Sequence, residues 1–569
     1  MEVTSLNVLV VPGVSIATRF DVLPPLPAAS GVVGIAAIID HPPAGSALIG
    51  LTKSAEIDTL LGPGTRASAP EIAHVLGNGA QEVVVSAVTG GGAASLTLNN
   101  SDGVAAVILR ARSNGTWAHN INVDVRSIAP ASSGVPRVTV RLLSGGRVVE
   151  EFPDLAGDRN DPASLFDVIN TRSVHVVAVD PGFDGDDPTP GTYALPGTGE
   201  GVPVTVTGEA TELFRILAET GVDPDGVSVE IAGTGNNITV RVSRDGTVLE
   251  EFTRLTMNPD SARHLPATLL ANSAVITLRQ ANSITDVNDR LPAALAPTPL
   301  AGGTSPNTAA FQTAIDALGN DPRINLVLAA IEPTASNATA RTIHQALVAH
   351  AVREADNGSP RVAFGHVTAS EQPSLDEIRD HAAAVRNRRF VLVSPAGAAG
   401  CVAGLVSRLS PEISPTFKPV PLFGLPAATY TGSELNKLLG PSHNACVVQQ
   451  RTGRGVIVLR GLDTSGDQIS VTRVADAAIR ETKAISENFI GQLNSSDARA
   501  ALKAQITATF TRMERAGQLV PSTDGSDPAF VVDVYSTQQD FAQGIVRIDI
   551  AIRPVRAIDF IYASIRVKN

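Results

Sequence analysis

Three apolar segments alternate with two amphipathic ones between residues 324 and 395. The apolar segments are INLVLAAI (324–331), RVAFGHV (361–367) and RFVLVSP (389–395). The segments that separate them, ATARTIHQALVAHAVREA and SLDEIRDHAAAVRN, repeat apolar residues at helical spacing. Continuous apolar strands separated by amphipathic helices are typical of a parallel sheet that helices cover on both faces. This alternation therefore predicts an α/β domain.

Elements of the same kind lie far upstream. Residues 30–92 contain the apolar runs GVVGIAAIID and EVVVSAV, which are typical of buried strands, and short helical stretches lie between them. A chain of 569 residues is too long for one hydrophobic core. We therefore expect residues 30–92 and 299–414 to form one discontinuous α/β domain, interrupted by an insertion.

The insertion, residues 93–298, is rich in strand-forming sequence and contains an internal repeat. VTVRLLSGGRVVEEFPDL in its first half corresponds to ITVRVSRDGTVLEEFTRL in its second half. The shared EEF triplets begin at Glu150 and Glu250, and a hairpin-type turn, Gly-Gly or Asp-Gly, precedes each of them. We expect a duplication that produces two similar β-modules, at 93–195 and 196–298.

The two ends of the chain have different characters. Residues 1–29 contain a short apolar run, LNVLVV, followed by several prolines, and predict an extended amino-terminal arm. Residues 415–569 predict an α+β carboxy-terminal domain with a terminal strand. Its first helix has an apolar stripe, formed by Val474, Ala478, Thr482, Ile485, Phe489 and Leu493. Its second helix begins at Ser495 or Ser496, ends at Gly517 and has a stripe formed by Leu502, Ile506, Phe510 and Met513.

The last residues, GIVRIDIAIRPVRAIDFIYASIRVKN, alternate apolar and polar side chains in two successive runs. In the first run the apolar residues are Val546, Ile548, Ile550 and Ile552, which predicts a strand. A second strand is expected from Ile558 to Val567. Proline cannot donate a ladder hydrogen bond, so Pro554 is the predicted joint between the two. A terminal strand is an open edge that can pair with another chain.

Composition excludes several classes of function. The formal net charge of −12 argues against a protein that binds the phosphate backbone of nucleic acid. Two cysteines are too few for a disulfide framework and are compatible with a reducing compartment. We find no signal peptide and no apolar run long enough to span a membrane. The expected place of synthesis and first use is a cytoplasm.

Residues that could carry chemistry lack the spacing that chemistry requires. His344 and His350 are six residues apart, on different faces of a helix, and are interpreted as ordinary helix residues. His443 and Cys446 have metal-like spacing but no second pair, and the loop DPGFDGDDPTP lacks the pattern of a calcium site. The glycine-rich stretches lack the flanking elements of a nucleotide site, and no nucleophile elbow is present. We expect no catalytic residue, no cofactor and no metal.

Several segments, taken in order, resemble the sheath protein of contractile phage tails and of phage-derived contractile injection systems. They include VVPGVSI near the start, ALIGLTKSAEIDTLLGPGT, GTWAHNINVDV, LAGGTSPNTAAFQTAIDAL, LNKLLGPSHNACVVQQRTGRGVIVLRGLDT and the closing FAQGIVRIDIAIRPVRAIDFIYASIRV. The likeness covers most of the chain outside the insertion, and the order of the segments is more specific than any one of them.

The resemblance implies a structural protein without enzymatic activity. It implies a helical homo-oligomer of stacked rings that surrounds an inner tube protein, is bounded by baseplate and terminator or cap proteins, and contracts to drive the tube through a target envelope. Such a sheath is assembled in the cytoplasm of a bacterium or infected host and becomes part of a virion tail or injection particle. The energy comes from subunit packing, so no nucleotide site is needed. No nucleic acid partner and no direct membrane insertion are expected.

The resemblance also implies roles for individual residues. In the family, the two ends of each subunit complete sheets of neighbouring subunits. The donated arms would carry Leu6, Val8, Val10, Ile558, Phe560, Tyr562, Ile565 and Val567, and the acceptor sheet would carry Val546, Ile548, Ile550 and Ile552. The hinges would be Pro12, Gly13 and Pro554. The candidates for attachment to the tube are Arg499, Lys503, Arg512 and Arg515.

Alternatives remain at this point. Both arms could pack within their own subunit, and the four cationic residues could simply be solvated. The chain could be a non-contractile structural or adhesive protein whose β-modules bind a receptor. It could also be an α/β enzyme with a β-rich accessory domain, which predicts a pocket near Ser394 or Gly365 at the carboxyl ends of the strands.

Overall fold

The computed structural model describes residues 31–43, 47–128, 136–158, 161–181, 188–195, 203–208, 212–219, 221–259, 261, 263–280, 292–440 and 444–564. Its contacts divide the chain into two compact units. The larger unit comprises the described chain up to Asp476 together with the terminal segment from Arg556. Among the described residues, the smaller unit comprises Ala477–Val555.

An eight-stranded sheet with the order β2-β3-β1-β18-β19-β20-β21-β22 is the centre of the larger unit. Its strands are β1 (Val32–Ala37), β2 (Leu48–Leu51), β3 (Glu82–Ala87), β18 (Leu326–Ala329), β19 (Val362–His366), β20 (Phe390–Ser394), β21 (Cys446–Arg451) and β22 (Gly455–Val458). The strands from β3 to β21 in this order are parallel, whereas β2 and β22 are antiparallel edge strands. Because β1 pairs with both β3 and β18, the segments before and after the β-rich insertion share one sheet.

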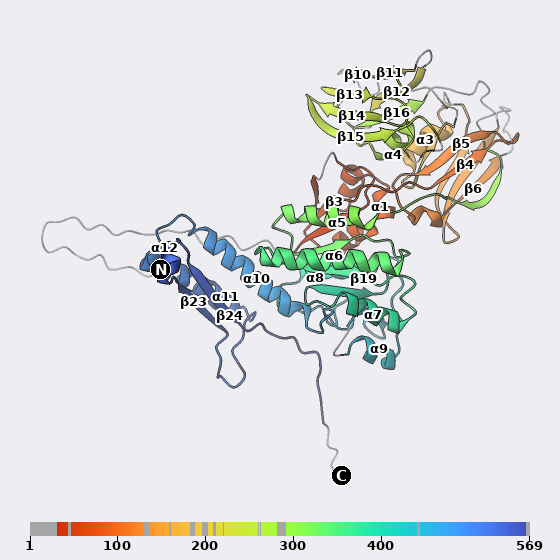
Figure 1. Ribbon diagram of the computed structural model, residues 1–569. Helices are drawn as coiled ribbons and strands as arrows, with labels where there is room; N and C mark the ends of the chain where they lie inside the picture. The colour runs from red at the N-terminus through yellow and green to blue at the C-terminus, as the bar shows by residue number, and fades with distance from the viewer. Residues whose placement is uncertain are drawn as a thin grey trace, which may run out of the picture. The chain divides into compact units, whose positions relative to one another are not determined.

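Helices cover both faces of this sheet, and Figure 1 shows α5 and α6 on one of them. One face is covered by α2 (Pro70–Gly77) and α8 (Ala399–Arg408), and the other by α5 (Thr308–Ala317), α6 (Asn337–Asp356) and α7 (Leu375–Ala384). Val33 and Ile35 of β1 belong to the first core, and Val32 and Ala36 belong to the second. The parallel sheet with two covered faces, which the alternation at 324–395 predicts, is therefore present.

Two glycines allow α8 to lie directly on α2. A Cβ added at Gly400 would lie 2.8 Å from the carbonyl oxygen of Glu71, and one at Gly404 would lie 2.5 Å from that of Val75. The shorter helical elements of this unit are η1 (Ile57–Leu61), α1 (Thr65–Ser68), η2 (Trp117–Asn120), η4 (Leu318–Asn320) and α9 (Gly432–Leu438).

The insertion contains two β-modules of the same strand order. Module 1 has the sheets β4-β5-β9 and β17-β6-β7-β8 with helix α3, and module 2 has the sheets β11-β12-β16 and β10-β13-β14-β15 with helix α4. The elements of module 1 are β4 (Ser95–Asn99), β5 (Ala105–Ala111), β6 (Ile121–Ile128), β7 (Arg137–Ser144), β8 (Arg147–Leu155), α3 (Leu165–Arg172), β9 (Val176–Val179) and β17 (Leu295–Pro299). Those of module 2 are β10 (Gly191–Ala194), β11 (Val204–Thr207), β12 (Glu212–Ala218), β13 (Val227–Ala232), β14 (Ile238–Arg244), β15 (Thr247–Leu255), α4 (Leu265–Asn272) and β16 (Ile276–Gln280).

The modules exchange one strand each. β10 follows the last strand of module 1 in sequence but pairs with β13 of module 2, and β17 follows module 2 but pairs with β6 of module 1. The boundaries expected at residues 195 and 298 therefore do not separate the two sheets. The physical reason is that a short edge strand takes its place from tertiary pairing, which the repeat in the sequence does not record.

The smaller unit consists of helices and one hairpin. It contains the end of α10 (Ile469–Glu487), α11 (Ser496–Arg515), α12 (Gln538–Ala542) and the antiparallel strands β23 (Phe530–Tyr535) and β24 (Arg547–Ile552). The side chain of Ser495 accepts a hydrogen bond from the backbone N–H of Ala498 and caps α11, as predicted. The predicted stripe of α11 is buried, and its Phe510 ring meets that of Phe530 edge-on at 5.6 Å.

The first carboxy-terminal helix is shorter than its apolar stripe predicts. α10 ends at Glu487, so Phe489 and Leu493 lie beyond it, and Leu493 is 86% exposed. The placement of these two residues on an inner helical face is wrong. The chain turns at Gly491, which has a φ of +83°, before the cap at Ser495 begins the next helix. None of the helices in the part of the chain described here is long and apolar enough to cross a membrane.

Candidate assembly site

The hairpin of β23 and β24 is a two-stranded sheet. Val546 immediately precedes β24, and Ile548, Ile550 and Ile552 alternate along the strand with exposed residues, so these four are half-buried on one face. Phe530 and Val532 of the neighbouring strand are opposite Ile552 and Ile550. A two-stranded sheet is marginal by itself and leaves backbone groups open at both outer edges. Its geometry fits an acceptor for further strands.

Pro554 lies directly after β24 and opposite Leu519. Hydrogen bonds flank this pair, from the backbone N–H of Val520 to the carbonyl of Arg553 (3.0 Å) and from that of Val555 to the carbonyl of Gln518 (2.9 Å). At such a position the backbone nitrogen of residue 554 faces away from its partner, so a proline is tolerated. The smaller unit ends one residue later, at Val555. The role of Pro554 as a hinge stays a prediction.

The segment from Arg556 is held by the loop 460–468 of the larger unit. Gln468 uses both ends of its amide, since its Oε1 accepts from the N–H of Ala557 (2.9 Å) and its Nε2 donates to the carbonyl of Ala557 (3.0 Å). Arg556 pairs with Asp467 at 2.7 Å. Burial alone would raise the pKa of Asp467, but hydrogen bonds, with that from Arg556 first, lower it below its ordinary value.

A third contact completes this arrangement. Arg460 Nε pairs with the buried carboxylate of Asp559 at 2.8 Å, and its guanidinium lies 4.9 Å from the ring centroid of Phe560. We call Arg460, Asp467 and Gln468 the arm clamp. Residues 460 to 468 are mostly polar and lie in a turn, so no periodic pattern in the sequence reveals this role. Sequence reasoning missed all three residues.

Beyond the arm clamp the chain is extended and exposed. Ile558, Phe560, Ile561 and Tyr562 are 79, 61, 85 and 93% exposed. From 556 to 564 the chain has no strand partner among the described residues, so this part of the expected second terminal strand is unpaired there. The predictions for Ile565 and Val567, and for the amino-terminal arm with Leu6, Val8, Val10, Pro12 and Gly13, concern residues outside the described part of the chain.

Three of the four tube-attachment candidates already have partners within the smaller unit. Arg499 donates to the side-chain oxygen of Asn494 at 2.6 Å. Lys503 lies 3.2 Å from Asp533, and Arg512 lies 3.3 Å from Glu481. Lys503 and Arg512 remain half-exposed, so these contacts are weak surface pairs. Arg512 and Arg515 line a shallow groove on α11 with Ala504, Thr507, Ala508 and Thr511.

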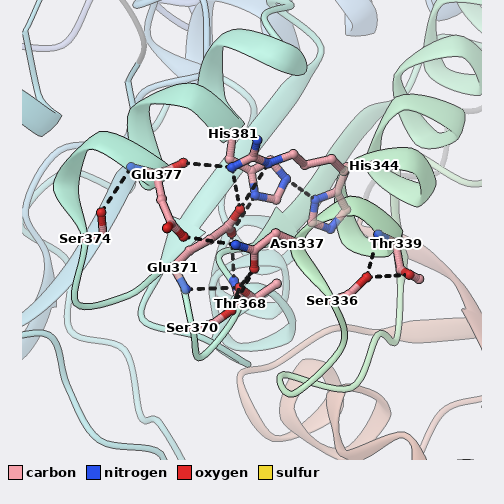
Figure 2. Close-up of polar contacts among 11 residues, drawn as sticks. Ser336, Asn337, Thr339, His344, Thr368, Ser370, Glu371, Ser374, Glu377 and His381 are labelled. Carbon is pink, nitrogen blue, oxygen red and sulfur yellow. Dashed lines mark hydrogen bonds and ion pairs between the residues drawn. The ribbon is translucent and has the colours of Figure 1, made fainter.

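A buried polar network joins α6 to α7 (Figure 2). Arg341 pairs with Glu371 at 3.0 Å, Glu371 lies 2.7 Å from His381 Nδ1, and His381 Nε2 lies 2.9 Å from His344 Nδ1. Burial, with a smaller effect of His381 and His366, holds the pKa of His344 well below its ordinary value, so this ring is neutral. His344, His381 and Glu371 have no solvent exposure. The network therefore supports packing and does not present a reactive group.

Side chains pack closely at Gly365 and Ser394, the two positions near which the enzyme alternative predicts a pocket. A Cβ at Gly365 would lie 2.4 Å from His344 Nε2, so the histidine ring fills the space beside this glycine. The hydroxyl of Ser394 lies 2.9 Å from that of Tyr430. Within the described residues no group of three or more metal-ligating side chains is found.

Comparison with known families gives a match at the carboxy-terminal end. Residues 463–568 match the model of the phage tail sheath C-terminal domain. The chain contains a phage tail sheath domain. The predicted resemblance to the contractile tail sheath family is thereby confirmed over residues 463–568, which include two residues of the arm clamp, β24 and the exposed segment after it. No curated protein matches the sequence.

Solved structures of sheath proteins are similar to this chain, two of them over most of its length. A sheath tail protein from Desulfitobacterium hafniense has 13% identity and a TM-score of 0.46, with 96% of this chain and 97% of that one covered. A sheath tail protein from Listeria innocua has 12% identity and a TM-score of 0.44, with 94% of both chains covered. The contracted helical sheath of the anti-feeding prophage has 18% identity and a TM-score of 0.37, with 48% of this chain and 78% of that one covered.

Proposed function

We propose that this chain is the structural subunit of a contractile sheath. Subunits polymerise helically around an inner tube in an extended, metastable state, and the polymer contracts to drive the tube through a target envelope. The partners are further copies of the chain, the inner tube protein, and baseplate and terminator or cap proteins. Assembly takes place in the cytoplasm of a bacterium or infected host. The role is structural, because contraction draws its energy from subunit packing and requires no catalytic group.

One observation carries this proposal. In a tail sheath domain, an extended apolar segment, Ile558 to Tyr562, is anchored by the arm clamp through Asp559 and Phe560 and has no strand partner among the described residues. The hairpin of the same domain likewise pairs with no third strand in the described part of the chain. Addition of the segment to the hairpin of a neighbour would satisfy the backbone groups of both and cover the apolar side chains. Main-chain hydrogen bonds would then keep subunits connected while they move.

The test removes the arm beyond the arm clamp. A chain that ends at Ala557 should lose assembly, with a rise of about a hundredfold or more in the concentration needed for polymer, because a whole inter-subunit strand is lost. Negative-stain microscopy of the protein, alone and with its tube partner, is the measurement. The intact chain should form striated tubes of two diameters. If the shortened chain assembled as well as the intact one, the arm would not be the strand that connects subunits.

A matched control separates loss of the arm from loss of the fold. Substitution of Gln468 by Ala removes both hydrogen bonds to Ala557 but keeps the arm. This variant should still assemble, at a higher protein concentration, because the root of the arm is less well positioned. Circular dichroism of both variants should equal that of the intact chain. If the shortened chain does not fold, the double variant Ile558→Asp with Phe560→Asp is tested instead. It keeps the length of the arm and removes its apolar contacts.

A further inference from the structure

The segment 414–420 covers the exposed edge of the eight-stranded sheet. The backbone N–H of Phe417 donates to the carbonyl of Val458 (2.7 Å), and the N–H of Val458 donates to the carbonyl of Lys418 (3.1 Å). The N–H of Val420 donates to the carbonyl of Val456 at 3.1 Å. These bonds blunt the edge strand β22 and fix the backbone of Phe417 beside Val458, the last residue of that strand.

Phe417 has an unusual backbone conformation for an aromatic residue. Its φ is +60°, in the left-handed region, and its side chain is 41% exposed. Such a conformation is strained for a bulky residue and persists where the surroundings enforce it. Phe423 also has a positive φ, +49°, but its ring stacks on His74 and fills the space over Gly77. Packing within the chain therefore explains Phe423 and leaves Phe417 unexplained.

The Phe417 ring lies beneath two arginines of the β21–β22 turn. The guanidinium carbons of Arg451 and Arg454 are 5.6 Å and 5.5 Å from the ring centroid. Both arginines are exposed, and among the described residues neither has a carboxylate partner. Stacking on a ring orients a guanidinium and leaves its N–H edge free for a carboxylate. Lys418, next to Phe417, adds a third positive charge.

We propose that Phe417, Arg451 and Arg454 form a docking surface for carboxylates on a second copy of this chain. This inference rests on the proposed helical sheath, in which every copy meets others. The charge balance supports this partner, because the chain carries a formal net charge of −12, whereas Lys418, Arg451 and Arg454 bring three positive charges to this surface. The strained Phe417 is then retained because its ring holds both guanidinium groups in place.

A charge-reversal variant tests the surface. R451E/R454E should raise the protein concentration needed for polymer about tenfold and reverse the effect of added salt on assembly. R147E/R386E is the matched control, since both of these arginines are exposed and lie elsewhere in the larger unit. The control should change assembly much less. Equal effects of the two double variants, or no effect of either, would overturn the proposal.

A second variant should weaken assembly without lowering the stability of the fold. Phe417→Gly relieves the left-handed backbone and removes the ring, so thermal stability should be unchanged or higher while assembly becomes weaker. Lower stability together with normal assembly would contradict the proposal, because Phe417 would then serve only the fold.

Photo-crosslinking identifies the partner. Benzoylphenylalanine at position 417 of the full chain should give covalent products of two copies, with the link in a segment rich in Asp and Glu. Links to the tube protein, to nucleic acid, or none at all would overturn the proposal. The same photo-crosslinking is also carried out on the soluble protein at high concentration. A chain–chain product there, without sheath, would count against the proposed sheath and not against this surface.

Discussion

Module 1 and module 2 share their architecture and differ in the electrostatics of one site. In each, a glutamate of the long hairpin strand closes the turn before the last strand. Glu150 accepts hydrogen bonds from Ser173 Oγ (2.6 Å) and the N–H of Val174 (2.9 Å). Glu250 accepts them from Ser273 Oγ (2.6 Å) and the N–H of Ala274 (2.7 Å). The duplicated backbone thus reproduces the geometry to within 0.2 Å.

One side chain separates the two sites. His175 Nδ1 lies 2.6 Å from Glu150, whereas Val275 has the corresponding place beside Glu250. Burial raises the pKa of Glu250 above its ordinary value. Burial acts in the same direction on Glu150, but hydrogen bonds from His175 and Ser173 outweigh it and lower the pKa. A repeat therefore preserves hydrogen-bond geometry, while a single neighbour decides whether the carboxylate is favoured in its charged form.

The largest expected effect tests whether the modules are structurally equivalent. Phe152→Ala and Phe252→Ala should each lower the free energy of unfolding by about 3 to 4 kcal/mol, because both rings are buried in the module cores. Because β10 and β17 are exchanged, hydrogen exchange should show lost protection in both modules for either variant. Fluorescence of Trp117, the single tryptophan, gives a second reading for module 1. If hydrogen-exchange protection is lost only in the mutated module, the exchanged strands do not couple the two modules as expected.

A smaller effect should separate the two glutamates. Glu150→Gln should cost about 1 to 2 kcal/mol at neutral pH, since it removes a charge-assisted bond to His175. Glu250→Gln should be nearly neutral, because the buried charge that it removes is itself unfavourable. Urea unfolding of both variants is the measurement. Equal losses would mean that His175 does not distinguish the sites.

The sign of the pH dependence follows from the same two pKa shifts. The lowered pKa of Glu150 contributes stability above the pKa of an unfolded glutamate, and this is lost as pH falls through the folded value. The raised pKa of Glu250 contributes stability below the unfolded pKa, and this is lost as pH rises through the folded value. Glu150→Gln should therefore flatten the acid side of the stability profile, and Glu250→Gln the side above it.

The smallest effect sharpens the comparison. Val275→His should lower the pKa of Glu250 and change stability at neutral pH by less than about 1 kcal/mol, because the new bond offsets the loss of a partly buried apolar side chain. The reverse substitution, His175→Val, should raise the pKa of Glu150. Carboxyl chemical shifts followed against pH give both values. If the pKa of Glu250 does not change in Val275→His, the difference in pKa between the two glutamates is not caused by the residue at this position.

Long-range pairing limited what the sequence predicts of the fold. The parallel sheet and the amphipathic helices follow from hydrophobic period, and the capped start of α11 follows from Ser495. The partners of β10 and β17 do not, because GTYA and LAPTP are short and carry no alternation. Likewise, apolar residues at helical spacing continue past Glu487, where α10 ends. The spacing therefore does not show that the chain leaves the helix before the turn at Gly491.

The assembly site was predictable to a similar degree. Alternation predicts the strand and the half-buried face of Val546 to Ile552. The joint at Pro554 stays a prediction from the chemistry of proline. The arm clamp depends on three polar side chains of one turn that meet residues about 90 positions away, and no local pattern encodes such contacts. The docking surface around Phe417 depends on a backbone angle, which sequence does not display for a residue other than glycine or proline.

The exchange of β10 and β17 determines the order in which the sheets of the two modules can be completed during translation. Module 1 presents β6 early, but the strand that closes this edge, β17, is translated roughly 170 residues later, or about 8 to 30 s at ordinary rates of synthesis. During that interval module 2 receives its own edge strand, β10, before the rest of its sheet exists. The second copy is therefore finished first. Until β17 is made, the nascent chain carries an open β-edge on module 1, which other strands or a chaperone would meet.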